Sequence, residues 1–225
     1  MMGMIVQEKA VVAPGEAIAE GMDYLPGEFT YRIGEKIIAK RLGLVEVAGR
    51  AVKLIPLSGR YLPKVGDTII GNVYDITLNG WLLNTNSAYN AMLNLKDTTR
   101  FIRKGDDLTR YIDVGDYIRA KIVNVTSQNV VDVTLKEPGL NKLNGGRIIR
   151  VSPSKVPRVI GKQGSMVMLI KEKTRCSIAV GQNGVVWIQG ENPDDELRAV
   201  NAIRKIEAEA HIEGLTERIT RFLET

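Results

Sequence analysis

Val159-Ile160-Gly161-Lys162-Gln163-Gly164 is the segment that decides the fold of this 225-residue chain. It lies between two short predicted helices: one with Pro157 in its first turn and Ser154 as a possible cap, and one over residues 165–174. Glycine adopts positive φ and has no Cβ, so backbone in a G-x-x-G loop can approach a phosphate closely. The helix that follows directs N–H groups and its positive dipole end to the same place, and Lys162 adds a charge. The segment therefore predicts a loop that holds a nucleic-acid backbone; a tight turn without a ligand is the alternative.

The elements around this loop follow the order β-α-α-β-β-α. Residues 147–151 predict a strand, and residues 177–180 and 185–188 predict a hairpin. A last helix begins with Asn192 as its cap and Pro193 at its first position, and Asp194, Asp195 and Glu196 complement its positive end. Four apolar residues are expected on one face of this helix: Leu197, Val200, Ile203 and Ile206.

Positive charge is concentrated around the same loop. The chain has 31 Lys and Arg against 26 Asp and Glu, a net charge of +5. Residues 142–175 alone hold nine basic side chains and one acidic side chain, which is +8, whereas residues 1–62 and 63–137 are nearly neutral. A solvated basic face without a ligand is one interpretation. The glycine loop inside the window favours the other, a local site for a phosphate backbone.

The first 137 residues read as short strands separated by turns. Residues 1–62 contain three such strands and predict a small β-domain. A weak repeat follows, in which Val65-Gly66-Asp67-Thr68-Ile69 recurs as Val114-Gly115-Asp116-Tyr117-Ile118, and each Gly-Asp predicts a turn before a strand. Five strands in about 75 residues suggest an OB-type barrel. The expected strands in these two regions are 36–40, 44–47, 51–56, 71–77, 80–83, 91–95, 121–126 and 130–135.

The chain has one His, His211, and one Cys, Cys176, which limits its chemistry. A zinc site needs about four such ligands, and one Cys cannot form a disulfide within the chain. His211, in a stretch expected to be helical, has no evident catalytic partner, and Asp106-Asp107 and residues 194–196 suit a loop and a helix start. We expect no catalytic residue, no metal and no cofactor. Without a membrane-length apolar run, and with residues 1–5 unlike a signal peptide, we expect a cytoplasmic protein.

Together these segments resemble a known family. Residues 146–210 resemble a type I KH domain, residues 63–137 resemble an S1 domain, and Ala13-Pro14-Gly15-Glu16, Ile55-Pro56-Leu57 and residues 60–67 are similar to exosome cap proteins. The best match is the KH-bearing cap family of the archaeal RNA exosome, ribosomal RNA processing protein four; the other archaeal cap has a zinc ribbon, which one Cys cannot supply. The resemblance implies a multidomain, β-rich plus α/β fold: an N-terminal β-domain (1–62), a five-stranded S1 barrel (63–137) and a type I KH domain with a C-terminal helix (138–225).

The resemblance implies a noncatalytic subunit that binds single-stranded RNA. In that family three cap subunits sit on a hexameric ring of RNase PH-like proteins, with the N-terminal domain on the ring. The cap binds RNA and guides its 3′ end through a pore to the phosphorolytic sites. Carried over to this chain, the loop of residues 161–164 contacts RNA backbone. The residues expected to bind RNA in and around this loop are Lys155, Arg158, Ile160, Gly161, Lys162, Gln163, Gly164 and Ile178.

The S1 segment departs from its family pattern. Many S1 domains carry aromatic side chains on the ligand face and a His in the next strand, where this chain has Asn79, Leu82 and Asn94. Because stacking on an aromatic ring contributes about 1–3 kcal/mol per base, we expect this barrel to bind RNA weakly or mainly to shape the pore. The candidate RNA contacts are Trp81, Tyr89 and Lys121, with packing as the alternative for both aromatic residues; Tyr111 and Trp187 are expected in a core or an interface.

Two other functions stay open. One is a stand-alone S1/KH factor in transcription elongation, antitermination or translation. Elongation factors of the NusA kind also place S1 before KH, but they have tandem KH domains of the other topology and a helical N-terminal domain. The other is an assembly protein for which RNA binding is incidental.

Overall fold

The chain divides into two compact units, one ending at Gly59 and one beginning at Arg60. The computed structural model describes residues 3–103 and 105–224, so Met1 and Met2 of the predicted N-terminal β-domain lie outside it. Within the described ranges, no helix combines the length and the apolar character needed to cross a membrane. The proposed division into 1–62, 63–137 and 138–225 stays a prediction.

The first unit is a small β-domain, as the sequence predicts. One sheet has the strand order β1-β6-β7-β3, and the other has the order β2-β5-β4. The core holds Ile18, Ile37 and Val52, and the buried Thr30 hydroxyl donates to the Val52 carbonyl at 2.9 Å. Alternation along the strands explains the core, because every second side chain points inward. The strands are β1 (Val11–Val12), β2 (Ala17–Glu20), β3 (Leu25–Pro26), β4 (Thr30–Ile33), β5 (Lys36–Ala39), β6 (Gly43–Ala48) and β7 (Ala51–Pro56).

The second unit begins with the predicted five-stranded barrel. The strand order is β12-β10-β9-β8-β11, and pairing between β12 and β11 closes it. In β11, Ile118, Ala120 and Ile122 are buried in the barrel, whereas Arg119 and Lys121 point outward. This alternation is the pattern from which the sequence predicts a strand. The barrel strands are β8 (Thr68–Thr77), β9 (Gly80–Asn84), β10 (Asn90–Asn94), β11 (Tyr117–Val125) and β12 (Val131–Thr134), and the 3-10 turns η1 (Leu95–Asp97) and η2 (Leu108–Arg110) lie between β10 and β11.

A sixth strand, β13 (Asn141–Leu143), adds to the outside of the barrel. It pairs antiparallel with β11, with Tyr117 opposite Leu143 and Arg119 opposite Asn141. The sequence gives no strand signal here, because three residues of mixed polarity are too few to show a period. The predicted boundary at residue 138 places these residues in the KH region, whereas they pair with a strand of the barrel sheet.

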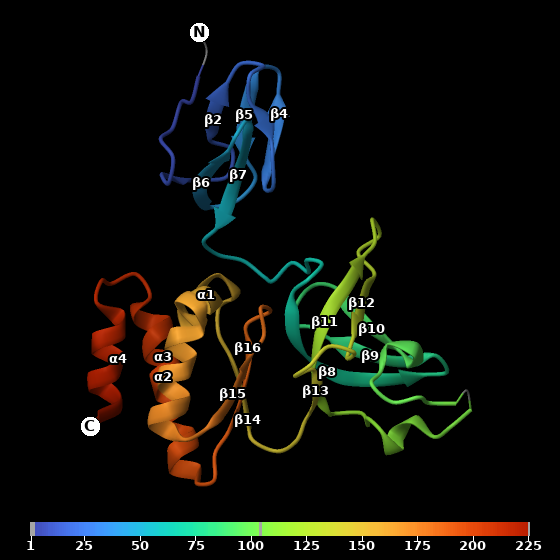
Figure 1. Ribbon diagram of the computed structural model, residues 1–225. Helices are drawn as coiled ribbons and strands as arrows, with labels where there is room; N and C mark the ends of the chain where they lie inside the picture. The colour runs from blue at the N-terminus through green and yellow to red at the C-terminus, as the bar shows by residue number, and fades with distance from the viewer. Residues whose placement is uncertain (1–2, 104, 225) are drawn as a thin grey trace. The chain divides into compact units, whose positions relative to one another are not determined.

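The remaining elements have the predicted β-α-α-β-β-α order. The sheet order is β14-β16-β15, and Figure 1 shows α1, α2 and α3 on one face of it. Ile170, Val186 and Ile203 are among the residues buried between the helices and the sheet. The elements are β14 (Arg147–Arg150), η3 (Pro153–Lys155), α1 (Val156–Ile160), η4 (Lys162–Gly164), α2 (Ser165–Thr174), β15 (Ser177–Val180), β16 (Val185–Gln189), α3 (Pro193–Glu209) and α4 (Leu215–Glu224).

Several details of this region differ from the expectations. Ser154 does not cap α1: it lies inside η3, and its hydroxyl is paired with that of Ser152 at 3.0 Å. Leu197 is 49% exposed, since the buried face of α3 turns toward Ala199 and Ala202 instead. His211 lies in the turn between α3 and α4 rather than in a helix.

Candidate nucleic-acid interface

The G-x-x-G loop joins α1 to α2 through strained backbone. Gly161 has φ 75° and ψ 172°, and a Cβ built there would lie 2.6 Å from the Met166 nitrogen. Gln163 and Gly164 also have positive φ, at 54° and 83°. Position 161 therefore accepts only glycine without rearrangement, because both its φ and the space around it exclude a side chain.

The loop presents two exposed side chains and a free charge. Lys162 and Gln163 are exposed, and so is Arg158 in the last turn of α1. Within the described ranges, neither Lys162 nor Arg158 has a hydrogen-bond or ion-pair partner. Unpaired cations beside an exposed loop are suited to a phosphate backbone, which they attract without paying to break an existing pair.

Three other predicted loop-region residues are less available. The Lys155 ammonium donates to the Glu207 carbonyl at 2.9 Å, so it is tied to the end of α3. Ile160 is half-buried against the KH core. Ile178 is 5% exposed and packs in that core, so it offers little surface, and its assignment to an apolar floor for bases stays a prediction. The alternating pattern of residues 177–180 predicts a strand, but it does not show which face of that strand the helices cover.

Only some of the nine basic side chains in residues 142–175 lack a hydrogen-bond or ion-pair partner among the described residues. Lys142 pairs with Asp116, Arg147 pairs with Glu196 at 2.8 Å, and Lys173 pairs with Glu224 at 3.0 Å. Since Lys155 is bonded to a carbonyl, five bases remain without a partner among the residues that the structure covers. These five are Arg150, Arg158, Lys162, Lys171 and Arg175.

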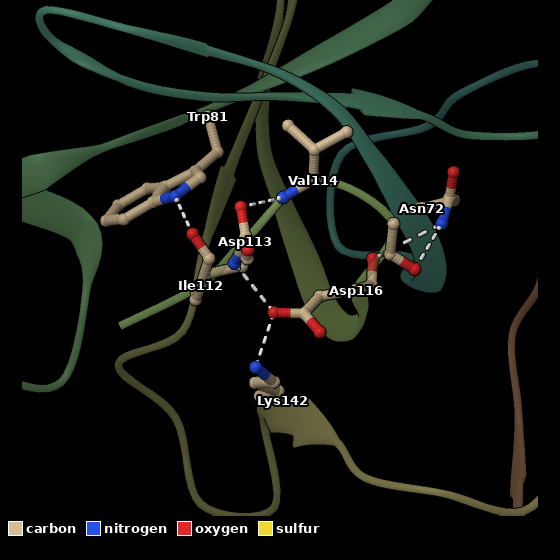
Figure 2. Close-up of polar contacts among 8 residues, drawn as sticks. Asn72, Trp81, Ile112, Asp113, Val114, Asp116 and Lys142 are labelled. Carbon is tan, nitrogen blue, oxygen red and sulfur yellow. Dashed lines mark hydrogen bonds and ion pairs between the residues drawn. The ribbon is translucent and has the colours of Figure 1, made fainter. Parts of the chain in front are cut away.

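The S1 candidates are packing or paired residues. Figure 2 shows that the Trp81 indole donates to the Ile112 carbonyl, at 2.7 Å, and the Trp81 side chain is fully buried. The prediction that Trp81 contacts RNA is therefore wrong, because a ring inside the barrel cannot stack on a base. Tyr89 is half-buried against the barrel core, and the Lys121 ammonium donates to both oxygens of the Glu137 carboxylate, at 2.6 and 2.8 Å.

The repeated Gly-Asp turns have a structural role. In the second copy, the Asp116 carboxylate accepts from the Asp113 N–H at 2.7 Å and pairs with Lys142, and Asn72 donates to the Gly115 carbonyl at 2.9 Å (Figure 2). In the first copy, Asp67 accepts from the Tyr61 hydroxyl at 2.5 Å, and burial, followed by this bond, raises the pKa of Tyr61. Both aspartates hold turns at the start of barrel strands, as the repeat predicts.

Phe101 is an exposed aromatic residue that the sequence pattern does not single out. Phe101 lies in the segment between η1 and η2 and is 89% exposed, with the exposed Arg100 and Arg103 near it in the chain. An aromatic ring with basic neighbours is typical of single-strand binding surfaces. The neighbouring basic residues could have indicated a binding surface here. The exposure of Phe101 itself could not be predicted, because an irregular loop has no periodic pattern of apolar and polar residues.

The KH sheet is fixed to the barrel by the turn between β15 and β16. Asn183 is fully buried; its side-chain amide donates to the carbonyls of Ile70 and Thr85, at 2.8 and 2.9 Å, and its side-chain oxygen accepts from the Ile70 N–H at 3.2 Å. Trp187 packs against the cluster of Ile70, Ala179 and Val185, as expected for a residue in a core or an interface. These contacts therefore hold the KH domain, which carries the G-x-x-G loop, against the barrel.

Three family models match consecutive parts of the chain. The model described as the exosome RNA binding protein RRP4 N-terminal domain matches residues 9–58. The model described as RRP4, S1 domain matches residues 60–104, and a KH domain model matches residues 146–194. The order agrees with the three segments expected from the sequence.

Full-length similarity extends the match. An exosome complex component Rrp4 from Pyrococcus furiosus is 40% identical over 227 residues, covering 99% of this chain and 86% of the relative. A protein of the same description from Methanothermobacter thermautotrophicus is 40% identical over 221 residues, covering 98% of this chain and 70% of the relative. A crystal structure of an exosome complex RNA-binding protein has a TM-score of 0.66 and 38% identity, and covers 74% of this chain and 96% of its own.

Proposed function

Because the chain belongs to the Rrp4 family of archaeal exosome components, we propose that it is a noncatalytic, RNA-binding cap subunit of such an exosome. It binds single-stranded RNA, helps to recruit it and guides its 3′ end into the pore of a phosphorolytic RNase PH-like ring. Three copies cap each ring. Its cytoplasmic location, expected from the sequence, stays a prediction.

The observation that carries the RNA-binding role is the exposed loop between α1 and α2. Its backbone is held in a conformation that requires glycine, and Lys162 and Arg158 are charged, exposed and unpaired within the described part of the chain. A KH loop of this kind clamps the backbone of about four nucleotides. The loop therefore supplies phosphate contacts, while the neighbouring surface decides how the bases lie.

The test replaces the two exposed loop residues and keeps both glycines. Lys162→Asp/Gln163→Asp should weaken binding of single-stranded RNA by about tenfold or more at moderate salt, since it changes the loop charge from +1 to −2. Lys162→Ala alone should reduce the slope of log affinity against log salt by about 0.7. Fluorescence anisotropy with a labelled oligonucleotide measures both.

The matched control is Lys173→Gln, which removes a charge from the far end of α2, where Lys173 pairs with Glu224. Unchanged affinity in Lys162→Asp/Gln163→Asp would remove the loop from the RNA site. Substitution of Gly161 is a poorer test, because any Cβ there lies 2.6 Å from the Met166 nitrogen and disturbs the fold as well as the loop.

The N-terminal unit is proposed to dock on the ring. Of the 19 exposed large apolar residues in the described part of the chain, eight lie in this unit, which is about a quarter of the sequence. Such residues favour a protein partner over RNA. Removal of residues 1–59 should abolish co-elution with RNase PH-like ring subunits in size-exclusion chromatography and leave RNA binding by the remaining unit intact. Continued co-elution would contradict the docking role.

A further inference from the structure

Two cavities lie on either side of β13. One, of about 360 Å³, is lined by barrel residues that include Arg100, Arg110 and Tyr111. The other, of about 310 Å³, lies between the barrel and the KH sheet, and Arg119, Lys171 and Trp187 help to line it. Asn141, Lys142 and Asn144 line both, so the two cavities are neighbours along one strand.

Both cavities are basic. Among the residues that the structure describes, neither lining includes an Asp or a Glu. Lys142 pairs with Asp116 and Arg110 pairs with Asp107 at 3.4 Å, so these two charges are compensated. Arg100, Arg119 and Lys171 have no ion-pair partner within the described ranges. The uncompensated charge therefore extends from the loop before η2, past β13, to α2.

Arg119 is the residue in these linings whose surroundings favour a bound anion most. It lies in the middle of β11, opposite Asn141 of β13, and its Nε is buried without a hydrogen-bond partner. A buried polar group without a partner destabilises the folded state, and more so when it carries charge. Because Arg119 also helps to line the second cavity, an anion there would offset its guanidinium charge.

Each cavity also offers groups that suit a base. Tyr111 lines the first cavity and Trp187 lines the second, and both side chains are partly buried. The amides of Asn141 and Asn144 can donate and accept hydrogen bonds. Basic side chains combined with aromatic rings characterise sites for single-stranded nucleic acid, and 300–400 Å³ is enough for roughly one nucleotide.

We propose that the two cavities are consecutive subsites for a single strand of RNA that passes along β13 between the KH domain and the barrel. Arg119 and Lys171 bind phosphate in the second cavity, and Arg100 binds phosphate in the first. This inference rests on the proposed RNA-binding function and extends it: the barrel takes part in binding through the cavities beside β13, although Trp81 is buried in its core.

The experiment compares Arg119→Gln/Lys171→Gln with the parent chain, using labelled oligoadenylates of about four and about twelve nucleotides. The substitution should weaken binding of the longer strand by about fivefold or more and lower its salt slope by about 1.4, two phosphate contacts at 0.7 each. Binding of the shorter strand, which the KH loop alone can hold, should be nearly unchanged. Lys173→Gln, on the same helix but paired with Glu224, should behave as the parent.

The loop variant Lys162→Asp/Gln163→Asp separates this inference from the proposed function, because it should weaken both strand lengths. If the cavity variant binds the longer strand as the parent does while the loop variant loses it, the inference fails and the function stands. Failure of the parent to bind either strand overturns both.

Two further outcomes are decisive. If inorganic phosphate alone removes the difference between cavity variant and parent, the cavities hold a free anion and the inference fails. Should the double variant lose its fold by circular dichroism, Lys171→Glu at its exposed position on α2 gives the same test. An equal loss of affinity in Lys173→Gln would show a general charge effect and would also contradict the proposal.

Discussion

Gly161 and Gly164 are alike in sequence but differ in their surroundings. Gly161 is enclosed, with the Met166 nitrogen 2.6 Å from a built Cβ, whereas nothing lies within 4 Å of one at Gly164. Both have positive φ, so alanine is strained at either position. At Gly161, a side chain would also clash with the Met166 backbone nitrogen. Backbone cannot move aside as the end of a flexible side chain can.

We therefore expect Gly164→Ala to lower the free energy of unfolding by about 1 kcal/mol and Gly161→Ala by about 2–3 kcal/mol. Urea unfolding followed by circular dichroism measures both, and Gly164→Ala serves as the control for the φ cost. Equal losses in the two variants would mean that the chain near Met166 relaxes freely. The difference also predicts that Gly164 is the better position at which to probe RNA contact by substitution.

Trp81 and Phe101 show what sequence could not decide about single residues. Both are aromatic residues in the S1 segment, and the sequence singles out Trp81 as a candidate RNA contact, with packing as the alternative, but not Phe101. The structure buries Trp81 completely and leaves Phe101 89% exposed. In-or-out alternation fixes a face only where the register is known, and a loop residue has no register at all.

At the scale of elements, Glu196 ties the start of α3 to two neighbours. Its carboxylate accepts from the Gly190 N–H at 3.2 Å and pairs with Arg147 of β14 at 2.8 Å. The Gly190 bond first, and then the Arg147 bond, hold the pKa of Glu196 below its ordinary value of 4.5. Since the pKa is lower in the folded state, the stabilisation is complete above 4.5 and is lost as pH falls below that value.

Glu196→Gln should therefore be less stable than the parent at about pH 7, and the difference should be smaller at about pH 3, because the parent carboxylate is progressively protonated as pH falls toward and through its lowered pKa. Thermal unfolding midpoints at the two pH values test this. Glu191→Gln removes an exposed carboxylate just before the same helix and provides the control. A difference that stays constant with pH would mean that the Arg147 pair contributes nothing to folding.

Long periodic elements were predictable, and short or terminal ones were not. The helix over 165–174 and the hairpin strands follow from apolar spacing and from glycine turns, and the structure confirms them. By contrast, β13 has three residues, and α4 lies beyond the six elements of a KH domain. α4 buries Ile219 and Leu223 against the KH core, a contact that depends on tertiary packing rather than on local pattern.

For the second unit as a whole, the relative orientation of barrel and KH domain is set by few but buried contacts. The turn between β15 and β16 places the Gln182 N–H on the Thr68 carbonyl at 2.8 Å, and Asn86 donates to the Asn183 carbonyl at 3.0 Å. Together with the three side-chain hydrogen bonds of Asn183, these contacts join the turn between β15 and β16 to β8 and to the end of β9. The sequence showed a turn here but nothing of its partner, because the two sides are 113 residues apart.

Asn183→Ala tests this junction. The substitution leaves the Ile70 N–H and the carbonyls of Ile70 and Thr85 without the Asn183 side chain, in a site where that side chain was fully buried. Because buried backbone groups without partners are costly, we expect a loss of about 2–4 kcal/mol in the free energy of unfolding. Guanidinium unfolding measures it, with Asn201→Ala on the exposed face of α3 as the control.

The same variant tests whether the two cavities beside β13 depend on the junction. If the turn fixes the KH sheet against the barrel, Asn183→Ala should weaken binding of the longer oligoadenylate more than that of the shorter one, since only the longer strand spans both domains. Faster proteolytic cleavage near Gly145 should accompany this loss, because the Trp187 indole, which donates to the Gly145 carbonyl at 2.7 Å, packs in the contact region. If Asn183→Ala weakens binding of both oligoadenylates equally and cleavage is not faster, the substitution acts on the KH loop. That result would contradict the role of Asn183 in fixing the KH domain against the barrel.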